Sequence, residues 1–150
     1  MTGSSEPRGT SPTLDGARGS FVNDVAPALV WTVIVFVFGG VPNPGPPVPL
    51  DFPIDKLEHA VAFAVLQILV LRALRYELPG TWPRAMPWVA AFISTLVGGA
   101  LELYQLTVPN RSAELLDLVS DALGAVLAAL VSVALERRRA AVPTQSRAQP

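Results

Sequence analysis

The chain has 150 residues, the length of a single domain, with 15% charged residues, 51% hydrophobic residues and a net charge of −1. Ordinary soluble domains are about 25% charged, so this chain has too few charges to cover a water-facing surface. The composition argues against a soluble enzyme, an intrinsically disordered protein and a nucleic-acid-binding protein. The absence of cysteine excludes disulfides, thiolate zinc sites and cysteine nucleophiles.

Prolines divide the chain into long hydrophobic stretches. Six of the 15 prolines lie in 42–53, whereas 54–78, 88–108 and 110–142 contain none. Proline interrupts helices, and about 20 helical residues cross a hydrocarbon core of ~30 Å. The sequence therefore predicts an all-α polytopic membrane protein, a bundle of four transmembrane helices at about 22–41, 55–75, 87–107 and 114–135. A soluble four-helix bundle is the alternative, but it would need polar outer faces that these stretches lack.

The ends of the chain differ from its hydrophobic middle. Thirteen of the first 20 residues are Gly, Ser, Thr or Pro, and the last residues are similarly polar. We expect a disordered N-terminal tail at 1–21, a transmembrane domain at 22–135 and a basic, disordered C-terminal tail at 136–150. Nine of the 11 basic residues lie in the tails and in the connection between the second and third helices. Because basic residues near membrane-spanning ends stay in the cytoplasm, both termini are predicted to be cytoplasmic.

Polar residues lie at one depth in the last three predicted helices, near the opposite surface. At 1.5 Å per residue, four of them, His59, Glu102, Asp117 and Asp121, lie about 5 to 10 Å below that surface. Within each helix they recur at i, i+3 or i, i+4 and so share a face. The set comprises Asp55, Lys56 and His59; Glu102 and Gln105; and Asp117 and Asp121. Since an intramembrane charge costs about 2.5–3.5 kcal/mol, such faces normally line a bundle interior or a hydrated cavity. The sequence therefore predicts a shared polar pocket that opens outward.

Small residues on the third and fourth helices favour close packing around this pocket. Two small-xxx-small pairs lie there: Ser94 with Gly98, and Gly124 with Ala128. Glu58 is adjacent to His59 but about 100° further round the helix, so we expect it to lie outside the site.

Three blocks of sequence carry these polar residues. They are Asp55-Lys56-Leu-Glu-His59-Ala-Val-Ala-Phe63, Glu102-Leu-Tyr-Gln105, and Arg111-Ser112 followed by Asp117-Leu-Val-Ser-Asp121-Ala-Leu-Gly124-Ala125. In this order and spacing, over about 55–130, the blocks resemble the VanZ-like family of small bacterial membrane proteins, named for a teicoplanin-resistance accessory protein. The resemblance implies a place in the bacterial plasma membrane and a link to the cell envelope and to low-level glycopeptide resistance, with no agreed reaction. The family usually has Asn where this chain has Asp121, which adds an acid to the pocket.

We hypothesise that the pocket binds an anionic lipid or a lipid-linked wall precursor. Lys56 and Arg111 would hold the anionic group, while Asp55, Gln105 and Asp121 would contribute to binding. His59, Glu102 and Asp117 would bind polar substituents or catalyse a transfer. Whether any reaction is catalysed stays open. Each residue also has a structural interpretation: His59 as an interhelical hydrogen-bonding group, the acids as ion-paired packing contacts, and the two cations as interfacial anchors.

Other functions stay open beside this hypothesis. No cofactor is predicted, but His59 with Glu102, Asp117 and Asp121 is a chemically reasonable ligand set for a divalent metal ion, although the spacing is not diagnostic. A small ion- or proton-coupled transporter, which would act as a homo-oligomer, is an alternative, and the absence of charge from the inner halves of the helices argues against it. A purely structural membrane module is the third interpretation.

Overall fold

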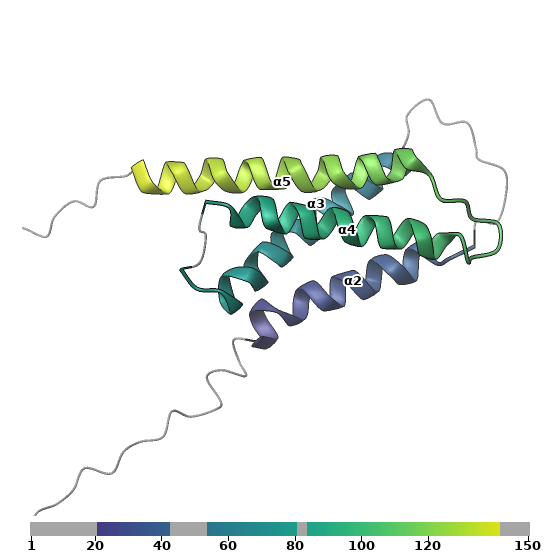
Figure 1. Cartoon of the computed structure of the whole chain (residues 1–150), viewed down its shortest axis with the longest axis horizontal. Helices are drawn as coiled ribbons and strands as arrows, with labels where there is room; N and C mark the ends of the chain where they lie inside the picture. Colours follow the sequence, from purple (N-terminus) through teal and green to yellow (C-terminus); the bar gives the residue numbers. More distant parts are fainter. Residues whose placement is uncertain (1–20, 43–53, 81–83, 142–150) are drawn as a thin grey trace, which may run out of the picture.

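Four long helices make up the described chain, which in this computed structural model covers residues 21–42, 54–80 and 84–141. In chain order they are α2 (Ala26–Gly39), α3 (Ile54–Glu77), α4 (Met86–Gln105) and α5 (Leu115–Ala141). They form one layered bundle in which α4 lies between α2 and α5, and α3 crosses behind α4 (Figure 1). The predicted tail 1–21 lies almost entirely outside the described residues, as does the part of the C-terminal tail after Ala141.

All four helices are long and apolar enough to cross a membrane, the first of them as the stretch Phe21–Gly39. Large hydrophobic side chains such as Val33, Phe92 and Leu127 are exposed on their outer faces, as lipid-facing residues are. The protein is thus a multi-pass membrane protein, and the predicted all-α bundle of four spanning helices is confirmed.

The helix ends follow from the local sequence. Pro27 and Pro87 lie in the first turns of α2 and α4, where a missing backbone N–H costs nothing. Gly40 is the C-cap of α2, and its N–H donates a helical hydrogen bond to the carbonyl of Phe36 at 2.9 Å. Asp117 lies in the first turn of α5, where the helix dipole favours an acid.

α5 continues beyond the predicted end at 135, through three arginines to Ala141. The chain contains no proline between Pro109 and Pro143. Glu136 also forms an ion pair with Arg75 of α3, which holds the additional turns against the bundle. The helix therefore covers the first six residues of the segment predicted as a C-terminal tail.

The tightest packing joins α3 to α5. Gly124 lies directly against the carbonyl of Ala60, so that a Cβ added at position 124 would overlap backbone atoms. α4 packs against both of these helices, whereas α2 contacts only α3 and α4 and more sparsely. A core of Val35, Phe63, Leu66 and Leu101 lies where α2, α3 and α4 meet. These contacts fix α3, α4 and α5 as a unit and leave α2 as its outer wall.

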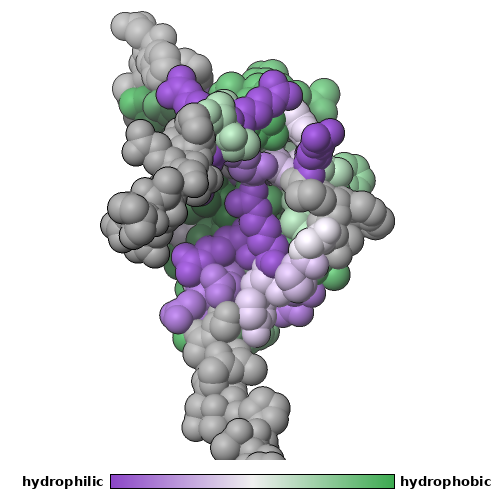
Figure 2. All heavy atoms as spheres, turned by 90° about the vertical axis from the view of Figure 1, so that its left-hand side faces the viewer, coloured by the Kyte–Doolittle hydropathy of each residue, from purple (hydrophilic) through white to green (hydrophobic). Residues whose placement is uncertain are grey.

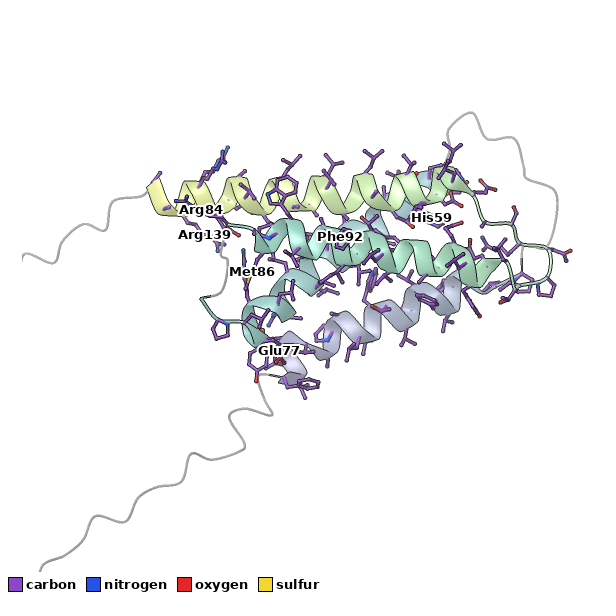
Figure 3. All side chains as sticks on the ribbon, in the orientation of Figure 1. His59, Glu77, Arg84, Met86, Phe92 and Arg139 are labelled. Carbon is purple, nitrogen blue, oxygen red and sulfur yellow. The ribbon has the colours of Figure 1, made fainter. Side chains whose placement is uncertain are left out.

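The two ends of the bundle carry opposite charges. We call one the acidic end; it holds Asp55, Glu58, Glu102, Glu114, Asp117 and Asp121. The other, the basic end, holds Arg72, Arg75, Arg84, Arg137, Arg138 and Arg139. Figure 3 shows His59 near the former and Arg84 and Arg139 at the latter. Hydrophilic residues gather on the basic end, with hydrophobic residues around its margin (Figure 2). α2 begins and α5 ends at this basic end (Figure 1).

Candidate functional site

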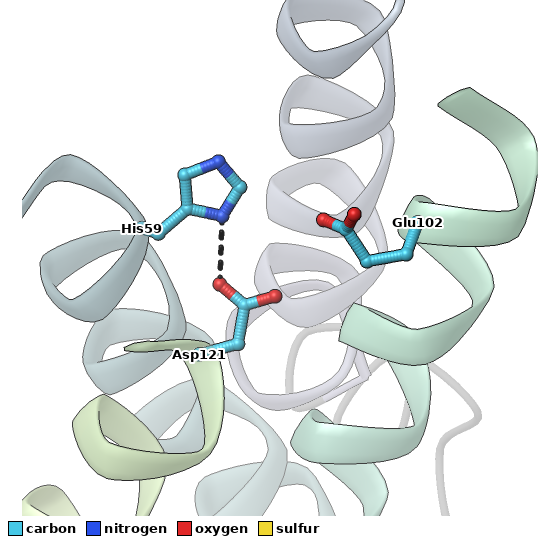
Figure 4. A group of neighbouring side chains, drawn as sticks. All are labelled: His59, Glu102 and Asp121. Carbon is cyan, nitrogen blue, oxygen red and sulfur yellow. Dashed lines mark hydrogen bonds and ion pairs between the residues drawn. The ribbon is translucent and has the colours of Figure 1, made fainter. Parts of the chain in front are cut away.

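One side chain from each of α3, α4 and α5 forms a cluster at the acidic end. We call His59, Glu102 and Asp121 the three-helix cluster. Nδ1 of His59 lies 2.8 Å from Oδ1 of Asp121, a hydrogen bond between α3 and α5. Glu102 reaches toward them from α4, with its carboxylate facing the same space (Figure 4). The side chains thus converge although His59 precedes Glu102 by 43 residues and Asp121 by 62.

Close approach of α4 and α5 makes this convergence possible. Gly98 precedes Glu102 by one helical turn, and a Cβ added there would lie 2.6 Å from Oδ2 of Asp121. Asp121 is fully buried, so its carboxylate occupies the space that glycine leaves open. The sequence predicted this small-residue position correctly.

A second group of charges surrounds Lys56, at the start of α3. Its ammonium donates to Oε2 of Glu114 at 2.7 Å and to Oδ1 of Asp117, and it lies 3.1 Å from Oδ2 of Asp55. Oδ2 of Asp117 in turn lies 3.8 Å from Nε2 of His59. Lys56 therefore joins the first turn of α3 to the first turn of α5, and its charge is engaged by carboxylates.

Two carboxylate oxygens of the three-helix cluster have no hydrogen-bond partner among the described residues. Oε2 of Glu102 accepts the backbone N–H of Glu114 at 2.7 Å, which ties α4 to the approach to α5. Oε1 of Glu102 and Oδ2 of Asp121 are both buried and unpaired. A buried polar atom without a partner costs about 1–3 kcal/mol, and more if it is charged. The cluster is therefore short of a donor or a cation.

A cavity of about 540 Å³ lies beside the cluster, between α2, α3 and α4. Its walls are mainly apolar, and α2 supplies one side of them. The apolar lining includes Trp31, Ile34, Val35, Phe38, Ala62, Phe63 and Leu101. The polar lining is Asp55, Glu58, His59, Gln105 and Arg111. The cavity thus joins a hydrophobic interior to a charged margin at the acidic end.

Hydrogen bonds hold the end of α2 at this margin. Nε of Arg111 donates to the carbonyl of Val41 at 3.0 Å, and Nε2 of Gln105 donates to the carbonyl of Gly39 at 3.3 Å. Nearer the middle of α2, the indole N–H of Trp31 donates to the carbonyl of Ala62 at 2.9 Å. These contacts position α2 as a wall of the cavity.

The structure separates the predicted site residues into two neighbouring groups. Lys56, Asp117, Asp121 and Glu102 lie beside the cavity without lining it. The predicted residues that do line it are Asp55, His59, Gln105 and Arg111. His59 lines the cavity and also belongs to the three-helix cluster. The two cations, expected to act together, thus have different surroundings: Lys56 is ion-paired, and Arg111 faces the cavity.

Two features of the site were missed by the sequence reasoning. Glu58 lines the cavity, whereas its angle from His59 predicted a position outside the site. The spacing of Asp55, Glu58 and Ala62 at i, i+3 and i+7 carries the signal, because such positions share a helix face. The residues of α2 that line the cavity also recur at helical spacing. Every face of α2 is hydrophobic, however, so this spacing does not distinguish the cavity side from the lipid side.

The fold and the site define a small polytopic membrane protein with a polar cluster at one end of its helical bundle. The family model described as VanZ/LLP1 matches residues 8–136. The chain belongs to this family, as the three sequence blocks predicted. No curated protein and no solved structure matches the chain.

Proposed function

We propose that this protein binds an anionic amphiphile of the cell envelope, a phospholipid or a lipid-linked wall precursor, in the cavity between α2, α3 and α4. The observation that carries the proposal is the combination of an apolar cavity with an arginine at its charged margin. Its volume of about 540 Å³ falls in the usual range of ligand sites, about 300–1,000 Å³. The apolar walls would take part of a hydrocarbon chain, and the margin would take the headgroup.

Arg111 is the residue we assign to the anionic group. Its guanidinium suits phosphate because it offers paired donors in a plane. Its Nε donates a hydrogen bond to the carbonyl of Val41. No carboxylate among residues 21–42, 54–80 and 84–141 forms an ion pair with Arg111. Lys56 would contribute indirectly, by fixing the start of α5 against α3, since carboxylates already engage its ammonium.

The acidic lining gives the site a second kind of recognition. Asp55 and Glu58 would accept hydrogen bonds from hydroxyl or ammonium groups of the headgroup, as sugars and amines provide. His59 would exchange a proton with the bound group if a transfer is catalysed, because it alone of His59, Glu102 and Asp117 lines the cavity. Glu102 and Asp117 would then act through His59.

The distribution of charge favours an outward-facing site. If the basic end lies in the cytoplasm, as the positive-inside rule predicts, the acidic end faces the cell exterior. A headgroup at that level would belong to the outer leaflet of the plasma membrane, where wall precursors are used. Binding there would connect the protein to glycopeptide tolerance.

Native mass spectrometry of the full chain, released from nanodiscs of mixed phosphatidylglycerol and phosphatidylcholine, tests the proposal. Wild-type protein should retain phosphatidylglycerol in preference to phosphatidylcholine. Arg111→Gln should lose this preference about 10- to 100-fold, the equivalent of one charged hydrogen bond. Arg84→Gln, which removes the same charge at the basic end, should keep it. Equal retention by wild type, Arg111→Gln and Arg84→Gln would contradict the proposal.

Substitutions that fill the cavity provide a second test of the proposal. Ile34→Trp enlarges a residue of the lining, whereas Val30→Trp enlarges a 57% exposed residue one turn earlier on α2. We expect only Ile34→Trp to reduce the number of lipids retained. In cells, Arg111→Gln and Ile34→Trp should lower glycopeptide tolerance at unchanged protein abundance. Tolerance that is unaffected while lipid retention falls would separate binding from the proposed physiological role.

A further inference from the structure

We propose that His59, Glu102 and Asp121 form a binding site for one divalent transition-metal ion. The inference goes beyond amphiphile binding, because it concerns the three-helix cluster and not the cavity. Each residue offers one ligand atom, and these atoms lie within 4.8 Å of one another. Ligands of a tetrahedral ion, each about 2.1 Å from it, lie about 3.4 Å apart. Side-chain rotations that bring the ligand atoms about 1.4 Å closer to one another would therefore complete the site.

The unpaired oxygens are the second observation that points to a ligand. Glu102 is 6% exposed and Asp121 is fully buried, and each has an oxygen without a hydrogen-bond partner. Both carboxylates face the space between α4 and α5 (Figure 4). A cation in that space would satisfy both oxygens at once. It would also replace the hydrogen bond between His59 and Asp121 with two coordinate bonds.

The charge balance of the acidic end favours a cation. Among the described residues this end has the six carboxylates named above and two permanent cations, Lys56 and Arg111. Lys56 is ion-paired with Asp55, Glu114 and Asp117, so it does not neutralise Glu102 or Asp121. A divalent ion bound by these two carboxylates and a neutral imidazole would form a neutral unit, which a low-dielectric interior tolerates.

The donor set selects the class of metal. One imidazole with two carboxylates suits Zn²⁺ or Mn²⁺, whereas Mg²⁺ and Ca²⁺ prefer oxygen ligands throughout. Three protein ligands leave at least one coordination position for water or for another molecule. Because His59 also lines the cavity, that position would lie close to a group bound there.

Metal binding can be measured on the purified full chain in detergent. After treatment with a chelator, calorimetric titration with Zn²⁺ and with Mn²⁺ should show one ion per chain. Co²⁺ should give visible absorption bands typical of nitrogen and oxygen ligands. Glu102→Gln and Asp121→Asn should each weaken binding at least about 10-fold. Glu77→Gln, which removes an exposed carboxylate at the basic end, should bind as wild type does.

Gly98→Ala supplies a variant that keeps all three ligands. Its Cβ would press on the carboxylate of Asp121, so it should also weaken binding, whereas Gly99→Ala should not, because a Cβ there meets nothing within 4 Å. Wild-type protein that binds neither Zn²⁺, Mn²⁺ nor Co²⁺ would overturn the inference and leave a proton shared by the carboxyl groups as the explanation of the unpaired oxygens. Equal binding by wild type, Glu102→Gln and Asp121→Asn would overturn it as well.

Discussion

Adjacent glycines on α4 allow the contact between α4 and α5 to be tested with two nearly identical substitutions. Gly98→Ala adds a Cβ that would lie 2.6 Å from Oδ2, 3.1 Å from Cβ and 3.2 Å from Cγ of Asp121. The whole short side chain is crowded, so rotating its end does not relieve the contact. Gly99→Ala adds the same methyl group where nothing lies within 4 Å. Both replacements raise helix propensity by about 1 kcal/mol.

The difference between the two variants therefore isolates the crowding. Inserting a methyl group into a packed interior costs about 1–3 kcal/mol. We expect Gly98→Ala to be less stable than Gly99→Ala by about this amount, and Gly99→Ala to be at least as stable as wild type. For a chain of this size, each kcal/mol corresponds to roughly 2–4 °C in Tm.

Thermal unfolding in detergent, followed by circular dichroism, measures the difference. Gly98→Ala should unfold several degrees below Gly99→Ala under identical conditions. Equal Tm values would mean that α4 and α5 do not approach closely at Asp121, and the geometry of the three-helix cluster would have to be abandoned.

Three further substitutions test the packing and the ion pairs. Gly124→Ala forces a methyl group against the carbonyl of Ala60. It should destabilise the bundle more than Gly98→Ala does, since backbone atoms cannot rotate away. A Tm equal to that of wild type would contradict the α3–α5 contact. Lys56→Met should lower the free energy of unfolding, measured by chemical denaturation, by about 1–3 kcal/mol, because the buried Asp117 loses its ion pair. An unchanged free energy of unfolding would show that the pair is not formed. Arg75→Gln should cost less than about 1 kcal/mol in the same assay, since its ion pair is exposed, and a larger loss would indicate that the basic end is more tightly packed than described.

The membrane-spanning bundle could be predicted from the sequence, because the length of each hydrophobic stretch and the positions of prolines determine the helices locally. The ends of the helices were harder to predict from the sequence. Glu136 and the arginines after it have the composition of a tail, and that composition does not reveal the ion pair of Glu136 with Arg75 on another helix.

The polar cluster could be predicted in part for a different reason. A charge inside the membrane must face the bundle interior, so helical spacing and depth already bring His59, Glu102 and Asp121 to one place. Their individual partners depend on side-chain positions that spacing does not determine. Lys56 is an example: from sequence it resembles Arg111, yet its ammonium is engaged by carboxylates while Arg111 faces the cavity.

The cavity was the least predictable feature. It exists because α2 packs sparsely against α3 and α4, and a uniformly hydrophobic helix carries no mark of which side is lipid and which is cavity. The angle between Glu58 and His59 on the helix predicted that Glu58 lies outside the site. A cavity wall, however, can include residues from more than one face of a helix.

The claim that the cavity holds an anionic amphiphile is tested most directly by an experimental structure in nanodiscs that contain phosphatidylglycerol. We predict density for a phosphate group within hydrogen-bond distance of the guanidinium of Arg111, continuous with a hydrocarbon chain between Ile34 and Ala62. An empty cavity in the presence of the lipid, with ordered lipid only on the outer faces of the bundle, would contradict the account.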